Sequence, residues 1–134
     1  MGNDMTEKSV YEICGRDFFG ALVNAFYDGV ETDPVLMSMY PDGSDTTEAR
    51  TRLTLFFVQY WGGPHEYMEQ RGHPMLRMRH NPFAIDATAR DRWLTHMAAA
   101  IEGTMHLIPD EHRDSVVQQL ANYVVNAAEH LRNQ

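Results

Sequence analysis

The sequence predicts an all-α fold in a single domain, and three observations support this prediction. Apolar residues recur with helical spacing along most of the chain, and no strand-like alternation is sustained. Several periodic segments open at a capping or first-turn residue, and Gly-Gly-Pro at residues 62–64 interrupts the pattern. The chain has 134 residues, which suits one domain with its own core.

The first half of the chain is expected to form three helices. The first has one broad apolar face made of two rows, Phe18, Leu22, Phe26 and Val30 beside Phe19, Val23 and Tyr27. A short helix over residues 35–40 follows Asp33 and Pro34, which act as cap and first-turn residue. The third begins at Asp45, where Glu48 resembles a capping-box partner. Its apolar side carries Ala49, Leu53, Phe56, Phe57 and Tyr60.

The second half adds two long helices after a broken stretch. Between residues 62 and 82, glycines and prolines leave room only for short helical pieces, one of them over residues 75–80. Asp86 is expected to cap a helix with Trp93, Leu94, Met97 and Ile101 on its apolar face. Pro109 opens the last helix, which buries Val116, Val117, Leu120, Val124 and Leu131. We expect one domain over residues 11–134 after an N-terminal extension over residues 1–10.

Composition narrows the classes of function. The net charge of −8 argues against nucleic acid and anionic membranes as partners. No apolar run is long enough to span a membrane, and the N-terminal residues are polar, so we expect a cytoplasmic protein without membrane insertion. A single cysteine, Cys14, forms no internal disulfide or Cys-rich metal site. These observations favour a small-molecule ligand.

Residues 70–85 differ from the rest of this acidic chain. They contain Arg71, Arg77 and Arg79 and no carboxylate, which suggests an anionic ligand. Leu76 lies four residues before His80, so an imidazole and an apolar side chain share one helical face. Haem needs this combination of iron ligand, apolar wall and cationic rim. A solvated surface segment is the alternative, because seven histidines make chance placements common.

Four strings in this part of the chain carry a family resemblance: Tyr60-Trp61-Gly62-Gly63-Pro64, Gln70-Arg71-Gly72-His73-Pro74, Leu76-Arg77-Met78-Arg79-His80 and Pro82-Phe83. Phe26-Tyr27, Tyr40-Pro41 and Trp93 continue it in the same order, so that it covers about residues 11 to 131. With these strings the chain resembles the group II truncated haemoglobins. The resemblance implies a truncated globin, a two-over-two helical sandwich around haem b.

The resemblance also implies roles for individual residues. It assigns the iron to His80 and hydrogen bonding of a bound ligand to Tyr27, Tyr40 and Trp93. The distal pocket would be completed by Ala49, Leu53 and Phe26. Haem contacts are expected from Leu76, Phe83, Met97 and Pro41, and propionate contacts from Arg79, Tyr67 and Arg52. Plain core packing is the alternative for Trp93 and Met97, and solvated surface is the alternative for Arg52.

Two departures from the family pattern concern the first corner and the loop after the second helix. Cys14-Gly15 stands where truncated haemoglobins often have paired glycines, so the corner is expected to turn differently. The connection from Tyr40 to Ala49 is about one residue longer than in close family members, which affects the positions of Tyr40 and Asp42.

The predicted function follows from donors placed around a bound diatomic ligand. Several donors in a dry pocket favour tight, slowly released dioxygen, together with redox chemistry of oxygen, nitric oxide or peroxide. Enzymatic turnover, as a nitric oxide dioxygenase or a peroxidase-like protein, needs an external reductase. The alternatives are a gas or redox sensor that acts through a separate partner, and a helical bundle without a cofactor. A homodimer is compatible with each of them.

Overall fold

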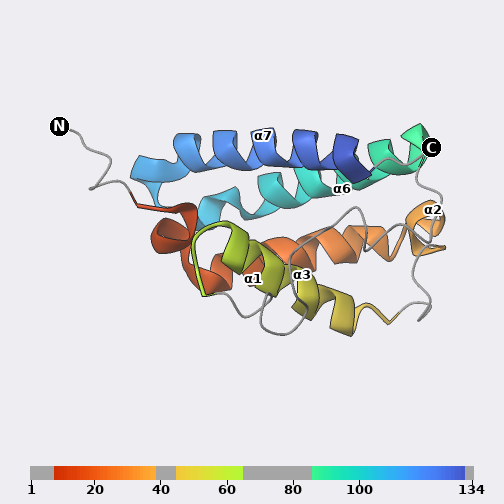
Figure 1. The fold of residues 1–134 in the computed structure, drawn as a ribbon, viewed down its shortest axis with the longest axis horizontal. Helices are drawn as coiled ribbons and strands as arrows, with labels where there is room; N and C mark the ends of the chain where they lie inside the picture. The colour runs from red at the N-terminus through yellow and green to blue at the C-terminus, as the bar shows by residue number, and fades with distance from the viewer. Residues whose placement is uncertain (1–7, 39–44, 65–85, 132–134) are drawn as a thin grey trace.

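Two pairs of helices pack across each other in the structure, a computed structural model that describes residues 8–38, 45–64 and 86–131 (Figure 1). One layer contains α1 (Val10–Val30) and α3 (Thr47–Tyr60), and the other contains α6 (Ala87–Thr104) and α7 (Arg113–Leu131). The short helix α2 (Pro34–Met37) follows α1, and 3-10 turns over Met105–Leu107 and Asp110–His112 join α6 to α7. Within these ranges every regular element is helical, which confirms the all-α, two-over-two prediction.

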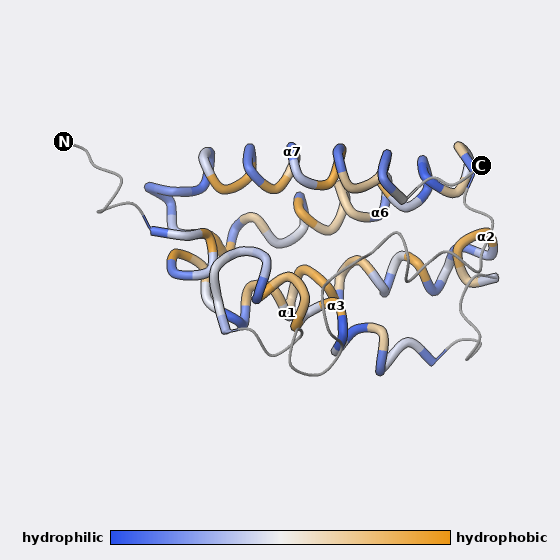
Figure 2. Tube along the Cα trace, viewed as in Figure 1, coloured by the Kyte–Doolittle hydropathy of each residue, from blue (hydrophilic) through white to orange (hydrophobic). Residues whose placement is uncertain are grey.

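The core lies between the layers, where α1 packs on α6, and it extends to the contact of α1 with α3 inside one layer. All seven residues of the predicted apolar face of α1 are buried, because their spacing keeps them on one side of the helix. Met97 and Ile101 of α6 and Val116, Leu120 and Val124 of α7 complete this core. Figure 2 shows the same segregation, with the hydrophobic side of α7 turned toward α6 and its hydrophilic side turned away.

Caps decide where several helices begin. The carboxylate of Asp33 accepts a hydrogen bond from the backbone N–H of Val35 at 3.0 Å, and that of Asp86 accepts one from Ala89 at 3.0 Å. Both predicted caps are therefore confirmed. At α1, Ser9 and Glu12 form a reciprocal capping box that the sequence analysis did not assign.

The predicted capping box of the third helix is wrong. The helix begins at Thr47, and Glu48 forms an ion pair with Arg52 at 3.0 Å instead of capping the backbone. The hydroxyl of Thr46, the actual N-cap residue, donates to a Glu31 carboxylate oxygen at 2.5 Å. Thr46 is buried, so its side chain contacts α1, and the local hydrogen bond at the start of α3 comes from the Asp45 carboxylate, which accepts from the Thr47 N–H at 3.0 Å. At the other end of α3, Tyr60 is 51% exposed, although the pattern placed it on the apolar side.

A glycine forms the first corner. The helical run of α1 is interrupted at Gly15, whose backbone has φ 80° and ψ 170°. L-residues rarely adopt this conformation, and glycine reaches it without a steric penalty. The single glycine of Cys14-Gly15 therefore bends the chain, and the five residues before it lie at an angle to the long helical part of α1.

Replacement of Gly15 by alanine is expected to destabilise the fold by about 1–3 kcal/mol, because it forces an L-residue into positive φ. No atom lies within 4 Å of the position of the added Cβ, so steric contact does not contribute. Gly20→Ala in the same helix is the matched control, since its added Cβ is equally free and its φ is not positive. Denaturant unfolding measures both changes, and equal effects of the two variants would contradict the explanation.

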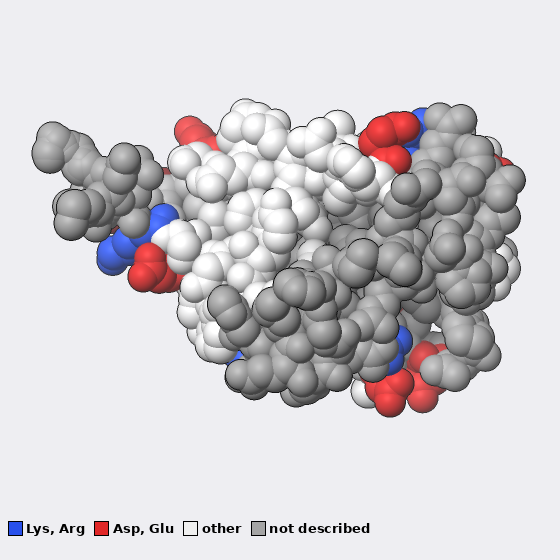
Figure 3. All heavy atoms as spheres, in the orientation of Figure 1, with Lys and Arg blue, Asp and Glu red and all other residues white. Residues whose placement is uncertain are grey.

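None of the described helices is long and apolar enough to cross a membrane. On the face in view in Figure 3, the charged side chains of the described residues gather toward the ends and lower edge of the molecule.

Candidate distal site

Phe26 joins the two predicted hydrogen-bond donors that the structure describes. Its ring centroid lies 4.9 Å from that of Tyr27 on the same helix and 5.8 Å from that of Trp93 on α6, both in edge-on geometry. Tyr27 and Phe26 are buried, whereas Trp93 is partly exposed. The structure therefore brings Tyr27, Phe26 and Trp93 into one aromatic group, although 66 positions separate Tyr27 from Trp93 in the sequence.

The indole N–H of Trp93 has no hydrogen-bond partner in the part of the chain that the structure describes. Trp93 nevertheless packs against the hydrophobic core as a partly buried residue. Because Trp93 is only partly buried, its N–H can reach an acceptor outside the described residues, whereas the buried indole N–H without a partner in the described ranges is that of Trp61. Relative to the described residues, Trp93 thus presents a donor without an acceptor beside apolar side chains of the core.

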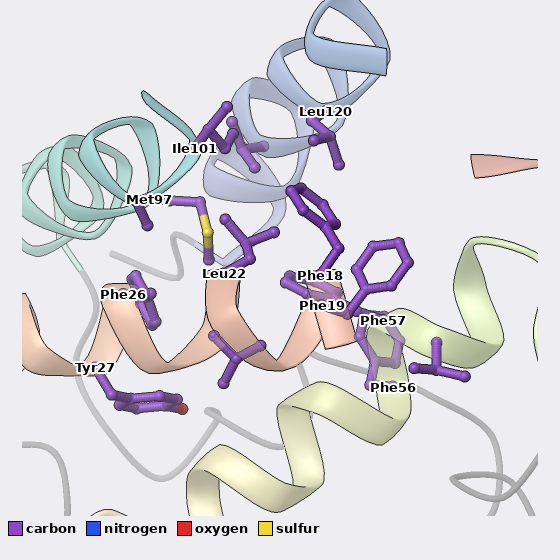
Figure 4. Packing of buried hydrophobic residues seen from close by; sticks show 14 of the residues in the cluster. Phe18, Phe19, Leu22, Phe26, Tyr27, Phe56, Phe57, Met97, Ile101 and Leu120 are labelled. Carbon is purple, nitrogen blue, oxygen red and sulfur yellow. The ribbon is translucent and has the colours of Figure 1, made fainter. Parts of the chain in front are cut away.

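The apolar wall continues on α3. Ala49 and Leu53 are one helical turn apart, and both are partly buried and packed against the core. Figure 4 shows Tyr27 on the side of α1 that faces α3, while Leu22 and Met97 lie between α1 and α6. Met97 is fully buried in the core, which agrees with its structural alternative, and its contact with haem stays a prediction.

Arg52, the described member of the predicted propionate contacts, lies on α3. Arg52 is paired with Glu48, as described above, and its propionate contact stays a prediction. The other predicted site residues lie outside the described residues: Tyr40, Pro41, Tyr67, Leu76, Arg79, His80 and Phe83. In the described ranges, no three His, Cys, Asp or Glu side chains gather into a group that suits a metal ion. The predicted iron ligand is therefore untested by geometry.

The described half of the site fits haem by its chemistry. A porphyrin needs apolar walls, and its small axial ligand needs a few fixed donors. Phe26, Ala49 and Leu53 supply apolar walls. The N–H of Trp93, which has no acceptor among the described residues, supplies a donor for the axial ligand. The residues present therefore suit this cofactor.

A second polar site, which the sequence did not indicate, lies at the start of α2. A recess of about 520 Å³ opens there, lined by Thr32, Asp33, Pro34, Thr88, Asp91, Arg92, Thr95 and His96. The Asp33 side chain is 3% exposed, and one of its oxygens lies 2.8 Å from His96 Nε2 and 3.2 Å from an Arg92 nitrogen. None of the predicted site residues lines this recess. The Asp33 contacts connect α2 to the helix that carries Trp93.

The Asp33 contacts predict a pH-dependent contribution to stability. Burial acts to raise the pKa of Asp33, but hydrogen bonds from His96, Arg92 and the Val35 N–H outweigh it and leave the pKa below its ordinary value. The ionised form therefore stabilises the fold at neutral pH, and this contribution is lost as the pH falls through the lowered pKa.

Asp33→Asn is accordingly expected to lower the free energy of unfolding by about 1–3 kcal/mol near neutral pH, the usual effect of removing a charged hydrogen-bond acceptor. The difference from the parent protein should be full at about pH 5 and shrink as the pH falls below about 3.9, the ordinary aspartate pKa, toward the lowered pKa of the parent carboxylate. Chemical unfolding across this range measures it, with Asp17→Asn, at an exposed position of α1, as the control. A cost that is the same at both ends of the range would contradict the assignment.

Comparison with known proteins agrees with this geometry. The family model of the bacterial-like globins matches residues 9–126. Over 92 residues the chain is 42% identical to the group 2 truncated hemoglobin YjbI of Bacillus subtilis, covering 69% of this chain and 68% of that protein.

Solved structures show the same similarity over nearly the whole chain. The thermostable hemoglobin of the actinobacterium Thermobifida fusca is 48% identical, with a TM-score of 0.84 and coverage of 94% of this chain and 98% of that one. The group II truncated hemoglobin of Bacillus anthracis is 35% identical, with a TM-score of 0.79 and coverage of 96% and 94%. The likeness therefore includes both sequence and helix arrangement.

Proposed function

Because this chain belongs to the bacterial-like globin family, and within it to the group II truncated haemoglobins, we propose that it binds haem b and holds dioxygen tightly. Family membership supports haem-based oxygen binding. The observation that carries the finer proposal is the aromatic group of Tyr27, Phe26 and Trp93, whose indole N–H has no acceptor among the described residues.

The donors act on the charge of the bound ligand. Haem supplies an iron that takes up a small diatomic ligand and shifts electron density onto it. The indole of Trp93 and the hydroxyls of Tyr27 and Tyr40 then donate hydrogen bonds to the partly negative ligand. Such bonds are stronger in an apolar, water-poor site than in solvent. Phe26, Ala49 and Leu53 keep this side of the site apolar, so release of oxygen is slow.

The remaining contacts that would hold the cofactor are assigned to the residues named from the resemblance. His80 binds the iron through a ring nitrogen, and Leu76, Phe83, Met97 and Pro41 contact the porphyrin. Arg79, Tyr67 and Arg52 bind the propionates. Arg52 can do so without releasing Glu48, because a guanidinium has five N–H donors.

The same donors support redox chemistry of oxygen, nitric oxide or peroxide, since they polarise an O–O bond as well as a bound diatomic ligand. A second protein supplies the electrons. A cytoplasmic location remains part of this proposal.

The experiment that tests the proposal is addition of haem b to the purified protein, followed by reduction and stopped-flow measurement of oxygen and nitric oxide kinetics. We expect a Soret band, slow oxygen dissociation and rapid loss of bound oxygen when nitric oxide is added. A protein without a Soret band after addition of haem contradicts the cofactor, and rapid oxygen release contradicts the role of the distal donors.

A further inference from the structure

Arg50, in the first turns of α3, forms a hydrogen-bond cluster, here called the hub, that links α3 to α1. Its Nε donates to the Thr46 hydroxyl at 2.8 Å, and one terminal nitrogen donates to the backbone and side-chain oxygens of Asn24 at 3.2 and 3.1 Å. The other terminal nitrogen donates to Asp28 at 3.0 Å and Glu31 at 3.1 Å. These five contacts match the five N–H donors of a guanidinium, so its orientation is determined by its partners.

The acceptors on α1 surround Tyr27. Asn24, Asp28 and Glu31 follow at helical spacing on one face, and Tyr27 lies between them in the sequence. The guanidinium carbon of Arg50 lies 5.8 Å from the centroid of the Tyr27 ring. This is within the range of a cation–π contact. Arg50 therefore holds α3 against α1 and at the same time covers one face of this ring.

Burial indicates that the hub is ordered. The side chain of Arg50 is 21% exposed, and the Thr46 hydroxyl below it also donates to Glu31. The hydrogen bonds from Thr46 and Arg50 hold the pKa of Glu31 below its usual value, so this acceptor is charged at neutral pH.

We propose that Arg50 is a positioning residue for Tyr27, which it keeps in the orientation that lets the phenol donate to the ligand. This inference rests on the distal role of Tyr27 proposed above. Arg50 acts on Tyr27 mainly by holding the orientation of its ring and less by its charge, because Asp28 and Glu31 neutralise that charge close to the ring. Lysine cannot replace it, since an ammonium has three donors and no planar fork.

The test is a double-mutant cycle between Arg50→Gln and Tyr27→Phe, with the oxygen dissociation rate of the haem-loaded, reduced protein as the first readout. Arg50→Gln is expected to raise the rate about fivefold in the parent and to change it less than about twofold in the Tyr27→Phe background. Arg50→Lys keeps the positive charge, but we expect its dissociation rate to remain closer to that of Arg50→Gln than to that of the parent.

The second readout is the C–O stretching frequency of the carbon monoxide complex, which reports the donor field at the ligand. It should move with Arg50→Gln in the parent and stay constant in the Tyr27→Phe background. Arg90→Gln is the matched control. Arg90 is also 21% exposed and bonded to two carboxylates, those of Asp91 and Glu129, and it joins α6 to α7 rather than α1 to α3.

Each outcome has a defined meaning. If Tyr27→Phe changes the rate and Arg50→Gln does not, the positioning role is wrong while the proposed function stands. Equal effects of Arg50→Gln with and without the Tyr27 hydroxyl, full rescue by lysine, or an equal effect of Arg90→Gln would each overturn the positioning role. If Tyr27→Phe itself has no effect, the proposed role of Tyr27 as a donor fails.

Discussion

His80→Ala is expected to abolish tight haem binding, with a loss in affinity of more than about a hundredfold. Changes in the outer shell of a metal ligand already cost about 10–100-fold, and this substitution removes the ligand itself. The measurement is a titration of the purified protein with haem, followed at the Soret band, together with the rate of haem transfer to a competing acceptor protein.

Two variants make the His80 prediction specific. His106→Ala, at an exposed position after α6, is the matched control and should bind haem like the parent. His80→Gly supplemented with imidazole should recover the spectrum of the parent, because the free ligand enters the vacated space. Unchanged haem affinity in His80→Ala would show that the iron is held by another residue.

Tyr27→Phe and Trp93→Phe are each expected to raise the oxygen dissociation rate by about tenfold, which corresponds to about 1.4 kcal/mol for one hydrogen bond to a partly charged ligand. The rate is measured by stopped-flow mixing of the oxygenated protein with excess carbon monoxide. The double variant shows whether the two donors act on the same ligand atom, since the effects of coupled donors do not add.

The controls for the distal donors lie at the C-terminal end of α3. Tyr60→Phe and Trp61→Phe remove the same polar atoms from an aromatic cluster with Tyr123, in which the Tyr60 and Tyr123 ring centroids are 4.6 Å apart. They should leave oxygen dissociation unchanged. If Tyr27→Phe and Trp93→Phe behave like these controls, the donor argument is wrong.

Short-range sequence patterns predicted correctly those features of the structure that depend on neighbouring residues. The face of α1 follows from helical spacing, and the Asp33 and Asp86 caps follow from a carboxylate and a backbone N–H two or three residues apart. The same reasoning failed at Glu48, although the Asp45 carboxylate does accept from the Thr47 N–H two residues on. Thr46 is drawn to Glu31 on another helix, and a local motif cannot anticipate a partner 15 residues away.

The candidate site likewise contains residues that the sequence identified and residues that only the structure identified. The resemblance selected Tyr27 and Trp93, and the structure places both beside Phe26. Arg50 carries no motif, and its role appears only when α3 crosses α1 and brings Asn24, Asp28 and Glu31 around one guanidinium. The Asp33 contacts with Arg92 and His96 likewise span about 60 residues, since they depend on how α6 lies against α2.

The helical class, the buried face of α1 and the globin family could therefore be predicted before the structure, because they depend on periodicity, local caps and strings of neighbouring residues. Tertiary structure alone decided which charged groups meet: Arg50 with its acceptors over Tyr27, and Asp33 with Arg92 and His96. The physical reason is that hydrogen bonds and ion pairs require distances of about 3 Å, and only the packing of whole helices sets such distances between remote residues.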